Sequence, residues 1–332
     1  MAKALVNGIT VAYDDVGEGD NVLVLVHGHP FNRTMWRPQM EWIGPFNRAR
    51  ARFEGVSSSE SLVETKGKRE GDSVVVPQRI FEHEDEHEHE HEDDGELPWR
   101  AIVPDLRGYG GSTVVPGKTT LDIFASDIAG LLDELGIRDV VIGGLSMGGQ
   151  IVMEFCRLYP ERVRGILLAA TFCRAETEQG KRQRAAMADR LLKEGMEPYS
   201  EEVLPKMVTP ANLIALPQVA DQVRSMMQAT DPIGAAAAIR GRAERPDYEE
   251  TLARVEVPAL VVVGDEDAFT SRADAEQMSN VLKRSELLWV KGVGHMPNLE
   301  REAEFNEGLG RLLERCAADG RCADDSRCAD DK

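Results

Sequence analysis

One serine of this sequence lies in a setting that can make it a nucleophile. Ser146 is the centre of Gly144–Gly148, which follows the apolar run Val140–Gly143 and precedes an amphipathic stretch from Gly149. A tight turn between a strand and a helix holds a serine side chain out of a sheet, and the glycines keep that turn free of clashes. The start of the helix stabilises negative charge that develops beside it. The pattern predicts nucleophilic attack by Ser146.

Other groups that this chemistry needs also follow predicted strands. A nucleophilic serine requires a base to take its proton and a carboxylate to orient that base. Candidates occur in four segments: His27–Pro30, Asp105–Ser112, Asp265–Asp267 and Gly292–Pro297, the last of which contains His295. The chain therefore contains the residue types of a serine hydrolase, each placed just after an apolar run.

The elements that must position these groups alternate along the chain. Short apolar runs without polar alternation predict strands buried on both faces, and helical patterns lie between them. An additional hairpin is predicted at the start, with its turn at Asn7-Gly8. Strands are expected at Ala2–Val6, Ile9–Tyr13, Val22–Val26, Ala101–Pro104, Val140–Gly143, Gly165–Ala170, Ala259–Val263 and Leu287–Val290, and helices near Met35–Trp42, Leu121–Leu135 and Ile151–Tyr159. This order predicts an α/β fold with a mostly parallel sheet and helices on both faces.

Two stretches interrupt the alternation. Residues 46–97 are basic first and then rich in Glu, Asp and His, with one plausible strand at Ser73–Val76. A structureless loop of this length is uncommon inside a domain, so we expect an insertion that is partly disordered or forms a small surface excursion. Residues 173–247 have helical patterns throughout, and their apolar positions need a partner surface, which predicts a helical cap over the sheet edge. The core is then 1–172 and 248–315, followed by a polar tail at 316–332.

With these motifs in this order, the chain resembles the α/β-hydrolase family over nearly its whole length, apart from the insertion and the tail. The resemblance implies the α/β-hydrolase fold, a mostly parallel central sheet flanked by helices, with a helical cap. It implies that Ser146 is the nucleophile and His295 the base. It also implies an oxyanion hole made by the backbone N–H groups of His29 and Met147. In the family the motif that begins at Asp105 is structural, so Asp105 is not assigned to catalysis.

The acid of the predicted triad has three candidates in one turn. Asp265, Glu266 and Asp267 all follow the strand Ala259–Val263. The family pattern, a glycine followed by two residues and then the acid, selects Asp267. Asp265 and Glu266 remain the alternatives, interpreted as solvated turn residues. The resulting chain order of serine, acid and histidine is the order of this fold.

The resemblance implies an acyl-transfer enzyme that needs no cofactor. Family members with haloalkane dehalogenase or epoxide hydrolase activity carry an aspartate at the elbow, so Ser146 argues against both chemistries. We expect a serine carboxylesterase that acts on a small-molecule ester or lactone through an acyl-enzyme. The alternatives are a lactonase resembling 3-oxoadipate enol-lactonase and a cofactor-free perhydrolase. An alternative of another class is a non-catalytic ligand-binding module on a hydrolase scaffold.

Composition excludes several other classes of protein. The formal net charge is -19, and such a surface repels nucleic acid. No apolar run approaches the roughly 20 residues of a membrane-spanning helix. Residues 1–8 lack the apolar region of a signal peptide, so we expect a cytoplasmic protein without a membrane partner. The sequence leaves the oligomeric state open.

Cysteine and histidine usage does not indicate a metal site. Cys156 and Cys173 lie in apolar surroundings that suit buried thiols, and the other three cysteines belong to a six-residue polar repeat at 315–332, which is typical of a solvated tail. The run from Glu82 to Glu96 interleaves acidic residues with His83, His87, His89 and His91. A helical His87/His91 pair would suit a divalent ion, but we interpret the run as a hydrated acidic segment and assign no metal.

Overall fold

The described chain forms one eight-stranded sheet. The structure, a computed structural model, describes residues 1–44 and 99–329, with side chains described up to residue 320. The strand order is β1-β2-β4-β3-β5-β6-β7-β8. Pairing is antiparallel between β1 and β2 and between β2 and β4, and parallel elsewhere. The strands are β1 (Ala2–Val6), β2 (Ile9–Val16), β3 (Asn21–Val26), β4 (Trp99–Pro104), β5 (Val140–Leu145), β6 (Val163–Ala169), β7 (Ala259–Gly264) and β8 (Ser285–Val290).

These observations confirm the predicted fold class and the antiparallel start. Asn7 and Gly8 have φ angles of 48° and 77°, the left-handed backbone that a two-residue hairpin turn requires. The insertion at 46–97, with the strand expected at Ser73–Val76 and the four histidines of 83–91, lies outside the described residues.

The central strands are buried on both faces, as their unbroken apolar runs predict. In β3, Val22, Val24 and Val26 belong to one core cluster, whereas Leu23 and Leu25 belong to another. Successive side chains of a strand point to opposite faces, so each cluster lies on one face of the sheet. A strand with this environment has no place for a polar side chain until it ends, and the functional groups therefore follow the strand ends.

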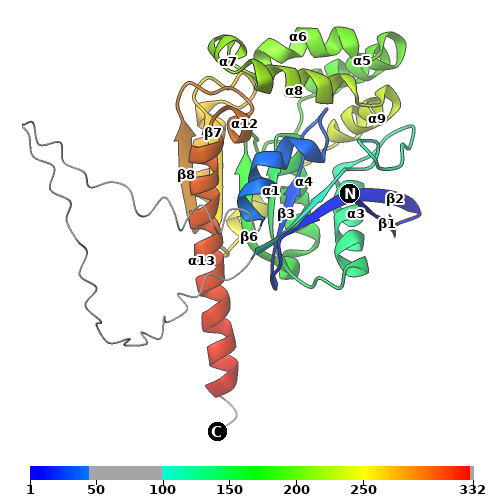
Figure 1. Cartoon of the computed structure of the whole chain (residues 1–332). Helices are drawn as coiled ribbons and strands as arrows, with labels where there is room; N and C mark the ends of the chain where they lie inside the picture. Colours follow the sequence, from blue (N-terminus) through cyan, green and yellow to red (C-terminus); the bar gives the residue numbers. More distant parts are fainter. Residues whose placement is uncertain (45–98, 330–332) are drawn as a thin grey trace, which may run out of the picture.

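Helices cover both faces of the sheet (Figure 1). On one face lie α3 (Leu121–Glu134), α4 (Met147–Leu158), α10 (Glu249–Ala253) and α11 (Arg272–Val281). On the other lie α1 (Arg37–Ile43), α12 (Pro297–Glu300) and α13 (Glu302–Ala329). Short 3-10 helices occupy Arg33–Trp36 and Pro160–Arg162. Within the described ranges, no helix combines the length and the apolar character needed to cross a membrane.

A layer of helices lies above the sheet (Figure 1). Residues 173–247 form α5 (Glu178–Glu194), α6 (Glu197–Met207), α7 (Pro210–Ala215), α8 (Pro217–Gln228) and α9 (Pro232–Arg242). We call these five helices the upper helical layer. Buried side chains from it, among them Leu204, Met207 and Val223, share a core cluster with strand residues. Part of the apolar surface of this layer therefore packs on the sheet domain, whereas Ala188, Leu191 and Ile239 belong to a cluster formed within the layer itself.

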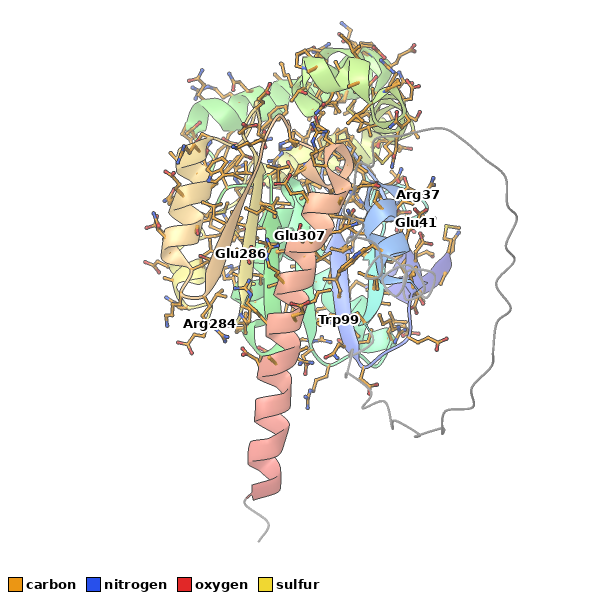
Figure 2. All side chains as sticks on the ribbon, turned by 60° about the vertical axis from the view of Figure 1, so that its left-hand side comes forward. Arg37, Glu41, Trp99, Arg284, Glu286 and Glu307 are labelled. Carbon is orange, nitrogen blue, oxygen red and sulfur yellow. The ribbon has the colours of Figure 1, made fainter. Side chains whose placement is uncertain are left out.

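The end of the chain differs from the tail that its composition predicts. Helix α13 continues to Ala329 and extends beyond the sheet (Figure 1). Cys316 and Ala317 are buried, and Cys316 contributes to the core. Arg311 of α13 pairs with Glu286 of β8 and with Glu307 one helical turn away; Figure 2 shows both glutamates. The first unit of the six-residue repeat thus forms part of α13, and its Cys316 packs in the core near Gly165 of β6.

Candidate active site

Ser146 lies at the sharp turn between β5 and α4. Its φ and ψ are 56° and -115°, a conformation that non-glycine residues rarely adopt. A Cβ built on Gly144 would lie 2.3 Å from backbone atoms of Gly148, and one built on Gly148 would lie 2.2 Å from the Val26 carbonyl oxygen. Only glycine fits at either position. The steric requirement predicted from the sequence is therefore present.

A cavity of about 580 Å³ brings the predicted groups together between the sheet edge and the upper helical layer. Ser146, His29 and His295 line it from the sheet domain. Side chains of the upper helical layer, such as Tyr199 and Arg242, line it from above. Among the described residues no hydrogen bond joins Ser146 to His295, but the two side chains share this cavity. A small substrate can therefore reach both.

Asp267 holds the imidazole of His295. Nδ1 of His295 lies 2.9 Å from both carboxylate oxygens of Asp267, and both side chains are buried. Burial alone would raise the pKa of Asp267, but His295 and the backbone N–H groups of Phe269 and Thr270 outweigh it, so this pKa is lowered. An ionised carboxylate only accepts, so the Nδ1–H of His295 donates and Nε2 is left free to act as a base.

The other two carboxylates of this turn face elsewhere. Oδ1 of Asp265 accepts a hydrogen bond of 2.7 Å from the backbone N–H of Gly292, and both Asp265 and Glu266 are exposed. Of the three candidates that follow β7, the structure brings only Asp267 to His295.

The loop after β3 packs against the elbow. A Cβ on Gly28 would lie 2.9 Å from the Leu145 carbonyl oxygen and 3.3 Å from Cβ of Ser146. In the part of the chain that is described, neither the backbone N–H of His29 nor that of Met147 donates to a protein acceptor. Both N–H groups therefore lack a hydrogen-bond acceptor among the described residues.

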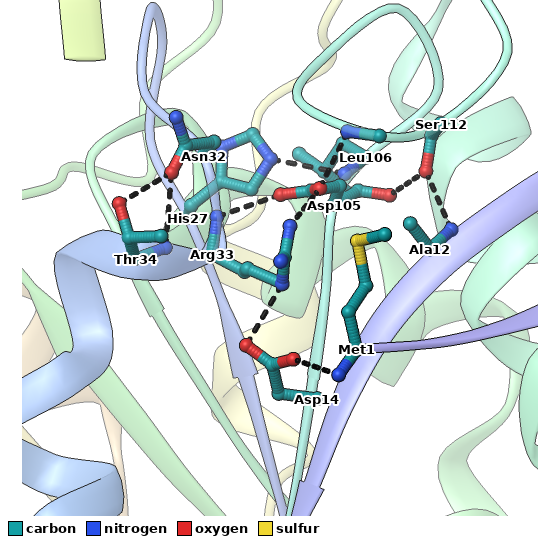
Figure 3. A network of polar contacts seen from close by, with 11 residues as sticks. Met1, Ala12, Asp14, His27, Asn32, Arg33, Thr34, Asp105, Leu106 and Ser112 are labelled. Atoms are coloured by element: carbon teal, nitrogen blue, oxygen red, sulfur yellow. Dashed lines mark hydrogen bonds and ion pairs between the residues drawn. The ribbon is translucent and has the colours of Figure 1, made fainter.

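Asp105 and His27 join the segment after β3 to the segment after β4 (Figure 3). The Asp105 carboxylate accepts hydrogen bonds from the backbone N–H groups of Arg33 and Gly111, at 2.8 and 2.7 Å, and pairs with the Arg33 guanidinium. Nε2 of His27 accepts from the backbone N–H of Leu106 at 2.9 Å. Both side chains thus hold the backbone of these segments in place, which is the structural role that the sequence predicts for Asp105.

The His29 side chain is a further polar group of the cavity. Its Nδ1 lies 2.8 Å from the Tyr109 hydroxyl, whereas its Nε2 is buried without a protein partner among the described residues. Burial, with smaller contributions from the charges of Arg242 and Arg184, holds the pKa of His29 well below its ordinary value. His29 is therefore a neutral imidazole that has one nitrogen left for a ligand.

The described cysteines are buried thiols rather than nucleophiles. Burial raises the pKa of Cys156 and of Cys316 to about 12 and that of Cys173 to about 11, so hardly any thiolate forms near neutral pH. Within the described ranges, no group of three or more His, Cys, Asp or Glu side chains is arranged to hold a metal ion.

Glu300 is a buried carboxylate of the site that sequence reasoning missed. One of its oxygens accepts hydrogen bonds from the backbone N–H groups of Gly294 and Met296, on either side of His295. The other accepts from the N–H of Thr209 and from Asn212 Nδ2, at 3.2 and 2.7 Å. Burial raises its pKa in spite of these four donors. Glu300 thereby ties the histidine loop to the upper helical layer.

Replacement of Glu300 is expected to loosen that loop. Each carboxylate oxygen of Glu300 accepts from two N–H groups. In Glu300→Gln one of these oxygens becomes an NH2 group, which cannot accept, so two N–H donors lose their acceptor in either orientation of the amide. We expect a loss of about 1–3 kcal/mol in the free energy of unfolding and a lower kcat. Chemical denaturation and ester kinetics measure both, with exposed Glu302→Gln as the control. A Glu300→Gln protein as stable and as active as the control would contradict this role.

Comparisons with known proteins agree with this architecture. The model of the alpha/beta hydrolase family matches residues 23–307. A thermophilic esterase from Thermogutta terrifontis has 30% identical residues and a TM-score of 0.75, with 95% of this chain and 98% of that chain covered. The enol-lactonase from Burkholderia xenovorans LB400 has the same fold at 22% identity, with a TM-score of 0.72, and covers 94% of this chain and 100% of its own.

A curated relative points in the same direction. The sequence is 26% identical over 214 residues to 3-oxoadipate enol-lactonase 2 of Acinetobacter baylyi, which covers 64% of this chain and 78% of the relative. The family model spans far more than half of the chain, so the protein belongs to the alpha/beta hydrolase family. It is a hydrolase, and esterases and enol-lactonases are among its relatives.

Proposed function

We propose that this hydrolase is a serine carboxylesterase in which Ser146, His295 and Asp267 form the catalytic triad. One observation carries the proposal: a serine on a strained elbow shares a cavity with a histidine whose Nδ1–H is held by a buried carboxylate. The shared cavity and the contact between His295 and Asp267 support the roles of nucleophile, base and orienting acid that acyl transfer requires. The thermophilic esterase with 30% identity supports the same reaction class.

The proposed reaction proceeds through an acyl-enzyme. Ser146 Oγ attacks the ester carbonyl carbon while Nε2 of His295 accepts the hydroxyl proton. The tetrahedral intermediate collapses, the alkoxide leaves with the proton from His295, and the acyl group stays on Ser146. Water, deprotonated by the same nitrogen, then attacks the acyl-enzyme and releases the acid. Asp267 keeps its negative charge and stabilises the imidazolium in each half of the cycle.

The backbone donors next to Ser146 fit the oxyanion formed in both steps. The N–H of Met147 is at the first turn of α4, where helix N–H groups lack an intrahelical acceptor. The N–H of His29 comes from the loop that packs on the elbow through Gly28. We propose that these two groups stabilise the charged oxygen of the tetrahedral intermediate. An interaction that is stronger with this oxyanion than with the neutral carbonyl of the substrate lowers the barrier of the reaction.

A lactonase is the second candidate because the chain is similar to 3-oxoadipate enol-lactonase 2. The same groups open a lactone, with the difference that the leaving alkoxide stays attached to the acyl chain. The upper helical layer is then the cap that shapes the acyl pocket.

A substrate panel tests the proposed function. Purified protein is incubated with p-nitrophenyl esters of increasing acyl length and, in parallel, with a series of lactones. We expect turnover of short to medium esters that depends on Ser146. Preferential opening of lactones would instead favour the lactonase, and absence of turnover on both series would favour a ligand-binding module.

Ester hydrolysis is expected to increase from pH 5 to pH 8. The pKa of Asp267 is lowered from its ordinary value, so its carboxylate stays ionised throughout this interval and contributes no change of charge to the profile. A catalytic histidine that is already protonated cannot accept the proton of the serine hydroxyl. Acidification therefore lowers kcat/KM, because it removes the neutral base. Initial rates across this interval, with the chemical step shown to be limiting, measure the effect. A flat profile would argue against His295 as the base.

A further inference from the structure

The cavity contains a guanidinium group, that of Arg242, for which the described part of the chain supplies no counter-ion. Nε of Arg242, at the end of α9, donates to the neutral amide oxygen of Gln150 at 2.7 Å. No other side-chain contact to Arg242 occurs among the described residues, so its two Nη groups have no protein acceptor. Burial and the nearby charges of Arg184 and Arg245 lower the pKa of Arg242 well below its ordinary value. Within the described ranges, this cation has no ion-pair partner.

The carboxylates of the cavity wall are already engaged. Glu176 pairs with both Arg184 and Arg245, and after the opposing effect of burial these two arginines lower its pKa to about 2. Glu202, the other acidic residue of the lining, pairs with Arg190 outside the cavity. At this wall Arg184 and Arg245 share the Glu176 carboxylate, whereas Arg242 pairs with none of the described carboxylates. A protein of net charge -19 thus has a cationic cavity.

Arg242 is held within reach of the reacting centre. Its partner Gln150 is one turn along α4 from Ser146, since the backbone N–H of Gln150 donates to the Ser146 carbonyl oxygen. Gln150 is completely buried, so it fixes the guanidinium against the helix of the nucleophile. The charge of Arg242 also contributes, after burial, to the lowered pKa of His29, which lines the same cavity as Ser146. A small molecule bound at Ser146 can therefore extend to Arg242.

We propose that Arg242 binds a free carboxylate on the acyl part of the substrate, so that the natural substrates are monoesters of short dicarboxylic acids or lactones that carry a carboxylate. This inference rests on the proposed esterase function. The planar guanidinium fork matches a carboxylate with two parallel N–H donors, and the partly desolvated wall strengthens the pair. Arg184 and Arg245 add positive potential, but each already pairs with the Glu176 carboxylate, whereas Arg242 pairs with none of the described carboxylates.

Matched ester pairs test the proposal. The substrates are the monomethyl esters of succinic, glutaric and adipic acid, each beside the analogue in which a carboxamide replaces the free carboxylate. We expect the wild type to have a higher kcat/KM for at least one charged ester than for its neutral partner. The measured quantity is the ratio of kcat/KM for the charged ester to kcat/KM for its neutral partner. In Arg242→Gln this ratio should fall on the order of tenfold to a hundredfold, the effect of one charge-assisted pair. Arg242→Lys, which keeps the charge without the fork, should fall in between.

Arg240→Gln is the matched control. Arg240 is also on α9, but it pairs with Asp189 and does not line the cavity, so its removal should leave the ratio unchanged. Glutarate binding to Ser146→Ala, measured by calorimetry with and without Arg242→Gln, gives a readout that needs no turnover. We expect binding only when Arg242 is present.

The outcomes separate the two proposals. The carboxylate site is overturned, and the esterase proposal stands, if neutral esters are hydrolysed through Ser146 without any preference for the charged partner. A preference for the charged ester that survives Arg242→Gln has the same consequence. If no ester or lactone is turned over, the esterase proposal fails, while glutarate binding that depends on Arg242 would still support an anion site. Loss of the ratio in Arg240→Gln as well would contradict a specific role of Arg242.

Discussion

Ser146→Ala is expected to lower kcat for ester hydrolysis on the order of a millionfold, the loss observed when a triad serine is removed. In the proposed mechanism the Ser146 hydroxyl forms the acyl bond, and the alanine variant has no hydroxyl there with which to form it. The alanine has the same Cβ, and the glycines that permit the turn are untouched. The variant should therefore fold and bind substrate as the wild type does.

Two measurements make this result decisive. Far-UV circular dichroism and thermal unfolding establish that the variant is folded, and burst-phase kinetics show whether an acyl-enzyme still forms. Ser225→Ala, an exposed serine of α8, is the control and should retain the wild-type rate. A Ser146→Ala protein with more than a small fraction of wild-type activity would refute the assignment of the nucleophile.

Asp267→Asn is expected to lower kcat about ten thousandfold. The amide cannot enforce the tautomer in which Nδ1 of His295 carries the proton, and it offers no negative charge to the imidazolium that forms during attack. The variant keeps the size of the side chain, and an amide oxygen can still accept from Phe269 and Thr270. The variant should therefore show a large decrease in kcat and little change in the free energy of unfolding.

The same turn contains the matched controls for Asp267. Asp265→Asn removes charge from a carboxylate that caps the Gly292 N–H, and Glu266→Gln changes an exposed side chain. Both variants should retain most of the activity, measured on the same ester. If Asp265→Asn were the variant that lost activity, the acid of the triad would have been placed two residues too late.

The parts of the fold that were predictable from sequence are those set by local patterns. Unbroken apolar runs such as Val22–Val26 and Ala259–Val263 require strands buried on both faces, and the structure contains them. The Asn7-Gly8 turn and the glycines at 144 and 148 are fixed by backbone sterics within a few residues. Patterns of this kind depend only on residues close together in the sequence. They therefore predict the fold without knowledge of any tertiary contact.

The groups that were missed depend on contacts distant in sequence. Glu300 belongs to the site only because the histidine loop and α7 meet around it, and Arg242 only because α9 passes over Gln150. No spacing or composition marks either residue. The C-terminal repeat misled in the opposite direction, because its polar composition conceals a face that buries Cys316 and Ala317 against the sheet.

The most direct test of a serine acyl-transfer mechanism is the position of a covalent fluorophosphonate adduct, located by mass spectrometry of peptides from the wild type and from Ser146→Ala. Such a reagent reacts with an activated serine and traps an analogue of the tetrahedral intermediate. The predicted result is one adduct, on the peptide that contains Ser146, which is absent from the alanine variant. An adduct on a different residue of an active preparation, or no adduct while ester hydrolysis continues, would contradict the mechanism.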